Sequence, residues 1–148
     1  MATRKVSNSI NILLVEDNDG DVRLTEEALK EGRIINTVYR VKDGIEALQF
    51  LRHEGAYTKA SEPHLILLDL NLPRKDGREV LIEIKTDAKL KHIPVVILTT
   101  SKEEADVMMG YNNYANCYIV KPVDLDQFLN IIKTITEFWF SIVSLPHK

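Results

Sequence analysis

Short apolar runs alternate along this chain with longer stretches in which apolar residues recur at helical spacing. The short runs are rich in Leu, Ile and Val, which is typical of strands buried on both faces. Strands are predicted at residues 10–15, 37–41, 65–68, 93–98 and 117–120. A helix with one apolar face is predicted after each strand, so the chain consists of five βα units.

Capping residues mark where several of these helices begin. Asp43 and Glu46 form a D-x-x-E pattern before the second helix, and Ser101 and Glu104 form a similar box before the fourth. Asp124 precedes the last helix. The apolar stripe of that helix comprises Leu125, Phe128, Leu129, Ile132, Ile135 and Trp139.

Strands that alternate with helices predict a parallel sheet covered on both faces, because parallel strands need crossover connections. Right-handed crossovers then favour a doubly wound α/β fold. We expect the flavodoxin-like (CheY-like) strand order 2-1-3-4-5, with its switch point between the first and third strands.

Polar residues follow the predicted strands at the edge where such folds place their ligands. Glu16 and Asp17 follow the first strand, Asp69 ends the third, and Lys121 follows the fifth. The first and third strands are neighbours, so the three acids converge and repel one another unless a cation lies among them. Oxygen ligands with room for water suit Mg²⁺. Thr99 adds a hydroxyl at the same edge.

This set of residues suits an aspartate nucleophile. A carboxylate can form an acyl phosphate when a metal ion neutralises the incoming charge, and Lys121 can contact the phosphoryl group. Phosphoryl transfer depends mainly on position and electrostatics, so little further machinery is needed.

Composition restricts the class of protein. The 148 residues predict one domain spanning 1–148, with an N-terminal arm at 1–8 and a C-terminal tail at 142–148. The net charge of −3 and the lack of a basic block give no support for nucleic-acid binding. A single cysteine, no signal peptide and no membrane-length apolar stretch predict a cytoplasmic protein that does not contact membranes.

Read together, these motifs resemble the receiver domains of two-component response regulators. The resemblance covers nearly the whole chain. It is carried by Glu16 and Asp17, by LLDLNLP at residues 67–73 with DG at 76–77, by VILTT at 96–100 and by YIVKP at 118–122. Each motif alone is weak, and their combination is specific.

The resemblance implies roles for individual residues. Asp69 is the expected phosphoacceptor, and Glu16, Asp17 and Asp69 with the Asn71 backbone carbonyl are the expected Mg²⁺ ligands. Lys121 is expected to contact the phosphoryl group and to precede a cis proline bond. Thr99 and Tyr118 are the expected switch residues. Glu16 departs from the second aspartate of many receivers, which puts the metal geometry in doubt.

A narrower resemblance links the chain to the stand-alone regulators that partner bacterial phytochromes. NLPRKDGREVL at 71–81, LTTS at 98–101 and the aromatic residues at 138–140 carry it. The resemblance implies a sensor histidine kinase, of the phytochrome class, as phosphoryl donor. Similar regulators pair through the fourth helix, fifth strand and last helix, which implies a homodimer. Candidate interface residues are Tyr118, Phe128, Ile131, Ile135, Phe138 and Phe140.

Other interpretations of these residues remain. Glu16, Asp17 and Asp19 are also typical of a helix cap. An aspartate-nucleophile phosphohydrolase shares the acid after a strand but typically needs a second aspartate where this chain has Asn71. A pseudo-receiver that only binds partners is a further alternative, although the acid set and Lys121 are intact. We expect a signalling phosphoacceptor that assists its own phosphorylation, not a metabolic enzyme.

Overall fold

The five predicted strands form one parallel sheet in the order β2-β1-β3-β4-β5, which confirms the expected doubly wound topology. The computed structural model describes residues 10–31, 36–110, 117–124, 126–127 and 130–131. The strands are β1 (Ile10–Val15), β2 (Asn36–Val41), β3 (Leu65–Asp69), β4 (Val95–Thr99) and β5 (Cys117–Val120). The helices are α1 (Asp19–Glu31), α2 (Gly44–Leu51), α3 (Gly77–Thr86) and α4 (Lys102–Gly110), with a 3₁₀ turn, η2, at Gly55–Tyr57.

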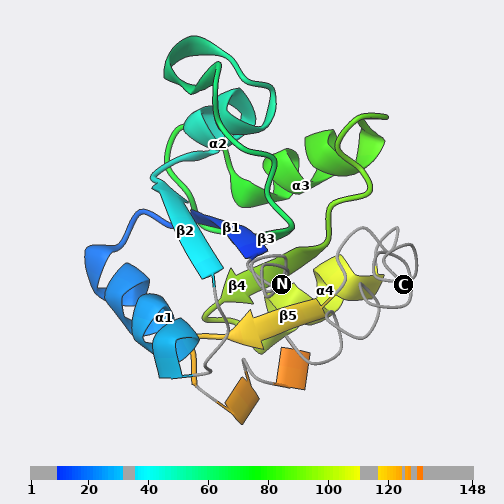
Figure 1. Ribbon diagram of the computed structural model, residues 1–148. Helices are drawn as coiled ribbons and strands as arrows, with labels where there is room; N and C mark the ends of the chain where they lie inside the picture. Colours follow the sequence, from blue (N-terminus) through cyan, green and yellow to red (C-terminus); the bar gives the residue numbers. More distant parts are fainter. Residues whose placement is uncertain (1–9, 32–35, 111–116, 125, 128–129, 132–148) are drawn as a thin grey trace, which may run out of the picture.

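Alternate residues of each strand face opposite layers, and each layer has its own apolar core. On one face, Leu13, Ile66 and Ile97 pack with buried residues of α2 and α3. On the other face, Leu14, Leu67 and their neighbours pack with buried residues of α1. Figure 1 shows α2 and α3 on one side of the sheet and α1 on the other. Both faces are buried, which explains why the strands read as continuous apolar runs.

The fourth strand begins at Val95, whereas the sequence pattern predicted Ile93. Pro94 has no N–H to donate to the ladder, although its carbonyl oxygen accepts a hydrogen bond from Ile66 N at 3.0 Å. The predicted loop over 54–62 also contains the 3₁₀ turn.

The predicted caps of α2 and α4 are present. Asp43 Oδ1 accepts a hydrogen bond from Glu46 N at 2.8 Å, and Ser101 Oγ accepts one from Glu104 N at 3.1 Å. After β5, Asp124 Oδ1 accepts from Asp126 N at 2.8 Å, and residues 126–127 and 130–131 are helical. The stripe predicted for the last helix, the arm at 1–8 and the tail at 142–148 lie outside the described residues.

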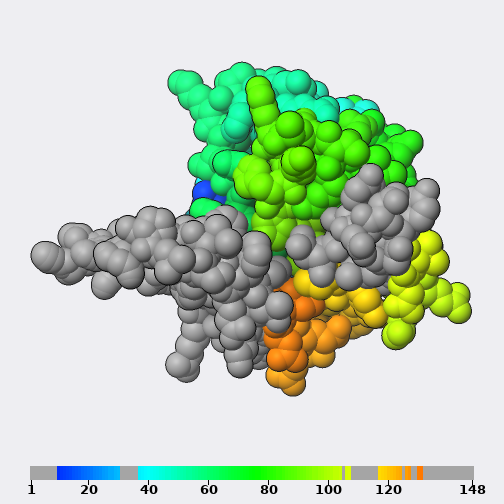
Figure 2. Space-filling view, turned by 90° about the vertical axis from the view of Figure 1, so that its right-hand side faces the viewer, coloured from blue at the N-terminus to red at the C-terminus, as the bar shows by residue number. Residues whose placement is uncertain are grey.

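The sheet and its connections bring α3, α4 and the segment after β5 to the surface on one side of the molecule (Figure 2). Among the described residues, no helix combines the length and apolar character needed to cross a bilayer.

Candidate functional site

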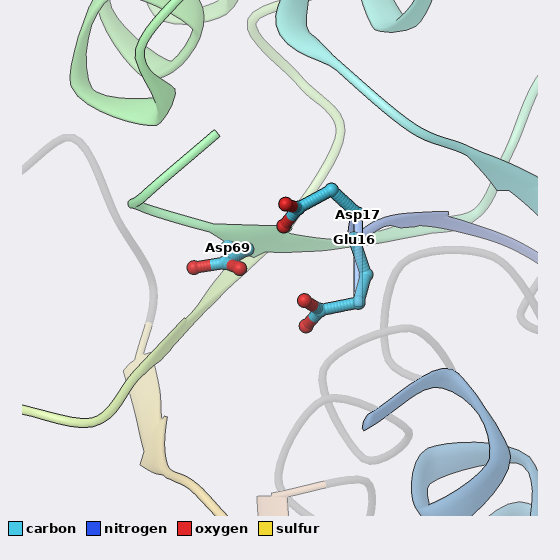
Figure 3. Close-up of side chains that lie close together, drawn as sticks. All are labelled: Glu16, Asp17 and Asp69. Carbon is cyan, nitrogen blue, oxygen red and sulfur yellow. The ribbon is translucent and has the colours of Figure 1, made fainter. Parts of the chain in front are cut away.

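Three carboxylates meet at the carboxyl edge of the sheet, as the sequence predicted. Glu16 directly follows β1 and is fully buried, Asp69 ends β3 and is 4% exposed, and Asp17 is exposed. One oxygen from each lies within 4.8 Å of the others (Figure 3). The buried Glu16 Oε1 pairs with the Lys121 ammonium group at 2.8 Å. This donor set fits a hard divalent cation.

The first turn of α1 explains how Glu16 and Asp17 are presented. Asn18 caps this helix, because its Oδ1 accepts from Asp21 N at 2.9 Å and its carbonyl accepts from Val22 N at 3.0 Å. Asp19 pairs with Arg40 at 2.9 Å. The interpretation of the neighbouring acids as the helix cap is therefore wrong. Glu16 and Asp17 remain available to the site.

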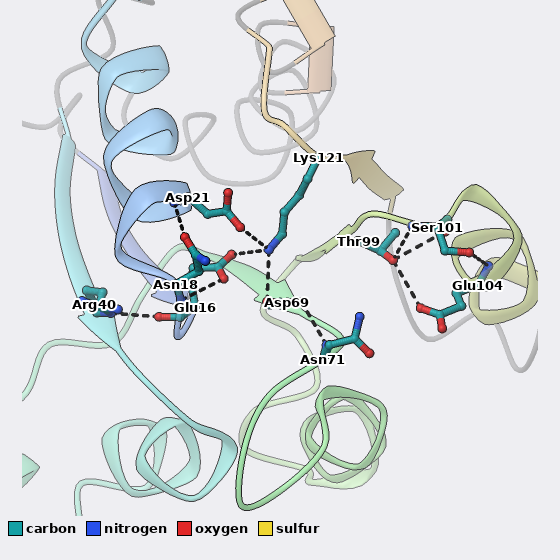
Figure 4. A network of polar contacts seen from close by, with 10 residues as sticks. All are labelled: Glu16, Asn18, Asp21, Arg40, Asp69, Asn71, Thr99, Ser101, Glu104 and Lys121. Atoms are coloured by element: carbon teal, nitrogen blue, oxygen red, sulfur yellow. Dashed lines mark hydrogen bonds and ion pairs between the residues drawn. The ribbon is translucent and has the colours of Figure 1, made fainter.

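Lys121 lies at the centre of the acid cluster. Its Nζ is 2.8 Å from Glu16 Oε1, 2.9 Å from Asp21 Oδ2 and 3.1 Å from Asp69 Oδ2 (Figure 4). Lys121 N donates to the Thr99 carbonyl at 2.7 Å, and the following bond to Pro122 is cis, as expected. The sequence analysis missed Asp21. The available signal was its place in the first turn of a helix that begins at this edge.

The electrostatics reflect three acids around one ammonium group. Burial raises the pKa of Glu16 to about 7, and Asp69 adds to the rise while Lys121 opposes it. Burial tends to lower the pKa of Lys121, but hydrogen bonds to Glu16 and Asp21 outweigh this effect and raise it. The Lys121 side chain therefore stays charged at neutral pH. The Glu16 carboxyl is partly protonated at that pH when no cation is bound.

The loop after Asp69 fixes the orientation of its carboxyl group. Asn71 N donates to Asp69 Oδ1 at 2.9 Å, so this oxygen points along the loop and Oδ2 faces Lys121. Gly77 N donates to the Leu70 carbonyl at 3.0 Å, and Asp76 caps α3. A Cβ at Gly77 would lie 2.2 Å from the Asp69 carbonyl oxygen, so only glycine allows this approach. The Asn71 carbonyl stays a predicted ligand.

Thr99 and Tyr118 both contact α4. Thr99 is fully buried, and its Oγ1 accepts from Ser101 N at 3.1 Å and donates to Glu104 Oε1 at 3.4 Å, away from Asp69 (Figure 4). Tyr118 is half-buried, and its hydroxyl donates to Asp106 Oδ1 at 3.3 Å. The sequence analysis missed the roles of Glu104 and Asp106 as partners of the two candidate switch residues.

Only part of the predicted dimer surface lies within the described residues. Ile131 is partly buried and packs against the core cluster that contains Ile12 and Leu14. Part of the Ile131 side chain, predicted as an interface residue, is therefore in the core and not at the surface. Tyr118 packs in part against the opposite core cluster. Phe128, Ile135, Phe138 and Phe140 lie outside the described residues.

Comparisons with known proteins agree with this geometry. Residues 12–133 match the response regulator receiver domain family. The response regulator Rcp1 of Synechocystis sp. is 48% identical over 135 residues, which cover 91% of this chain and 92% of Rcp1.

Solved structures give the same result. The phosphorylated cyanobacterial phytochrome response regulator RcpA superposes with a TM-score of 0.74 at 54% identity, covering 90% of this chain and 95% of that one. The Mn²⁺-bound form of Rcp1 has a TM-score of 0.73 at 47% identity, covering 90% and 96%. Sheet order, the edge cluster and these similarities together show that this chain belongs to the response regulator receiver domain family.

Proposed function

We propose that this protein is a response regulator that accepts a phosphoryl group on Asp69 from a sensor histidine kinase. The placement of Asp69 supports this most directly. Its carboxylate ends a buried strand, with an ammonium group 3.1 Å away and two further acids close by. Asp69 shares this ammonium group with Glu16 and Asp21.

The chemistry follows from these contacts. A carboxylate oxygen of Asp69 attacks phosphorus, the bond from phosphorus to the donor histidine nitrogen breaks, and the imidazole keeps the electron pair. Lys121 contacts the transferred group as a positive charge. We propose that Glu16, Asp17, Asp69 and the Asn71 carbonyl hold Mg²⁺, which when bound neutralises the negative charge of the phosphoryl group. The chain acts as a stoichiometric signalling component.

The conformational change that follows phosphorylation would involve α4 and β5. For Thr99 to reach a phosphoryl oxygen on Asp69, its hydroxyl must leave Ser101 N and Glu104. For Tyr118 to move inward, its hydroxyl must leave Asp106. Both movements change contacts of α4, which lies at the surface with the segment after β5 (Figure 2). A partner that prefers one arrangement of this surface would therefore sense phosphorylation.

The similar regulators suggest the donor class. RcpA is a phytochrome response regulator, and it shares 54% identity with this chain. We propose a phytochrome-class sensor kinase as donor, a cytoplasmic location and no nucleic-acid or membrane partner. We also propose a homodimer through α4, β5 and the last helix, with the two copies related by a two-fold axis.

The acceptor is tested by incubation with Mg²⁺ and acetyl phosphate, followed by intact-mass measurement. The wild type should gain one acid-labile phosphoryl group, and Asp69→Asn should gain none. Asp76→Asn is the matched control, because Asp76 lies in the same loop and caps α3. It should still be labelled. Labelling of Asp69→Asn equal to that of the wild type would contradict the acceptor assignment.

The homodimer is tested by size-exclusion chromatography with light scattering at tens of micromolar protein. We expect the mass of two chains under at least one of two conditions, with a phosphate analogue or without it. A monomer under both conditions would contradict the proposed dimer while leaving the acceptor assignment intact.

A further inference from the structure

Asp21 contacts the acid cluster, but the receiver chemistry gives it no role. It lies in the first turn of α1, and its Oδ2 accepts a hydrogen bond from Lys121 Nζ at 2.9 Å (Figure 4). The two residues are 100 positions apart in the sequence, so only the tertiary fold brings them together. Asp21 is not among the three acids whose oxygens converge on a possible cation position.

The ammonium group of Lys121 has three N–H donors, and three carboxylates lie within 3.1 Å of it. Two of them, Glu16 and Asp69, are also candidate cation ligands. The side chains of Glu16 and Asp69 are 1% and 5% exposed, whereas that of Asp21 is 31% exposed. Asp21 is therefore the more exposed partner of Lys121. It is also the partner that is not a candidate cation ligand.

We propose that Asp21 is a positioning residue that holds the Lys121 ammonium at the rim of the site when a divalent cation binds Glu16 and Asp69. This inference rests on the proposed function of the site. Without Asp21, the described carboxylates left to Lys121 are the two that the cation needs, so the ammonium competes with the cation. Asp21 also keeps the ammonium beside Asp69, where a transferred phosphoryl group would meet it.

A loss of cation affinity in Asp21→Asn has two candidate causes, and these must be separated. One is competition from Lys121, and the other is the loss of a nearby negative charge. Asp19→Asn is the matched control for charge, because Asp19 lies in the same helical turn but pairs with Arg40. Lys121→Met removes the competing ammonium and tests whether Asp21 acts through it.

The experiment is a Mn²⁺ titration followed by electron paramagnetic resonance, on the wild type, Asp21→Asn, Asp19→Asn, Lys121→Met and the Asp21→Asn/Lys121→Met double variant. We expect Asp21→Asn to weaken Mn²⁺ binding about threefold to tenfold, the effect of one charge-assisted hydrogen bond discounted for partial exposure. Asp19→Asn should bind as the wild type does. In the Lys121→Met background, Asp21→Asn should have no further effect.

The inference is overturned if Asp21→Asn binds Mn²⁺ like Asp19→Asn, or if it causes the same loss with and without Lys121. Asp21→Glu keeps the charge and should recover most of the affinity. If the circular dichroism of Asp21→Asn shows misfolding, Asp21→Ala replaces it in the comparison, and the same loss of affinity is expected only when Lys121 is present. Mn²⁺ affinity is read without phosphorylation, so failure here is distinguishable from labelling that survives in Asp69→Asn.

Discussion

The Glu16 carboxyl holds a proton more readily than an ordinary glutamate does, and this proton competes with a cation for the same oxygens. Glu16 is fully buried, and burial raises its pKa to about 7 from an ordinary value of 4.5. The folded chain therefore binds this proton more tightly than the unfolded chain does. In the metal-free protein, the contribution of Glu16 to stability is present below about pH 4.5 and is lost as the pH rises through about 7.

The affinity for divalent cations should consequently depend on pH in the neutral range. A cation must displace the proton from Glu16, so Mn²⁺ should bind more weakly at pH 6 than at pH 8, by up to about tenfold for each pH unit below 7. A Mn²⁺ titration at both values measures this. Glu16→Gln should bind more weakly and lose most of the difference. Equal wild-type affinities at the two pH values would contradict the role given to Glu16.

At the residue scale, the sequence was sufficient to predict the positions of site residues that lie at the end of a strand or directly after one. Glu16, Asp69 and Lys121 converge because parallel strands end at a common edge. Asn18 and Asp21 were missed, because their roles depend on how the first turn of α1 is oriented against that edge. The place of Asp21 in the first helical turn was a local signal, but it does not specify which group Asp21 contacts.

At the scale of elements, α4 connects the candidate switch residues to α3. The predicted capping box is half formed, since Ser101 caps the helix while Glu104 Oε1 contacts Thr99 at 3.4 Å and Arg78 at 3.1 Å. Arg78 also pairs with Asp76, the cap of α3. Glu104 thus holds the Thr99 hydroxyl in the arrangement that faces away from Asp69.

Removing Glu104 should therefore favour phosphorylation. Glu104→Ala frees the Thr99 hydroxyl to reach a phosphoryl oxygen, so the phosphorylated fraction at limiting acetyl phosphate should rise, by about twofold to tenfold for one hydrogen bond. A mobility-shift gel measures this fraction. The control is Glu103→Ala, an exposed neighbour in the same helical turn. If the two variants are labelled to the same extent, Glu104 does not restrain Thr99.

Strand boundaries were predictable to within two residues. The predicted bounds of the first and fifth strands coincide with β1 and β5, because a polar residue, Glu16 or Lys121, follows each apolar run directly. The predicted start of the fourth strand was two residues too early, because Pro94 reads as part of the apolar run although it has no N–H to donate to the ladder. Ile131 was predicted as an interface residue, yet it packs in part against the core, because an apolar side chain outside the main stripe of a helix can still meet the sheet.

At the scale of the whole molecule, folding places like charges together at one edge of the sheet. The topology was predictable, because crossover handedness and two-sided burial leave few alternatives for five βα units. The same topology brings Glu16, Asp17 and Asp69 within 4.8 Å of one another. The repulsion among them opposes folding, and any cation that binds only the folded chain offsets it.

Metal removal should accordingly lower the stability of the entire domain. At a Mg²⁺ concentration about 100 times its dissociation constant, the free energy of unfolding should rise by about 2.7 kcal/mol over the value in EDTA. Urea unfolding under the two conditions measures the difference. Asp17→Asn should be at least as stable as the wild type in EDTA, because one repelling charge is gone, and should lose most of the gain with Mg²⁺.

The control for this comparison is Asp19→Asn, since Asp19 is a neighbouring exposed acid that pairs with Arg40 and contributes no oxygen to the cluster. It should keep the full gain with Mg²⁺. If Asp17→Asn also kept it, the stabilising cation would lie elsewhere on the molecule. Loss of the gain in Asp17→Asn alone would instead mean that the acids which destabilise the metal-free sheet edge are the ones that bind the metal.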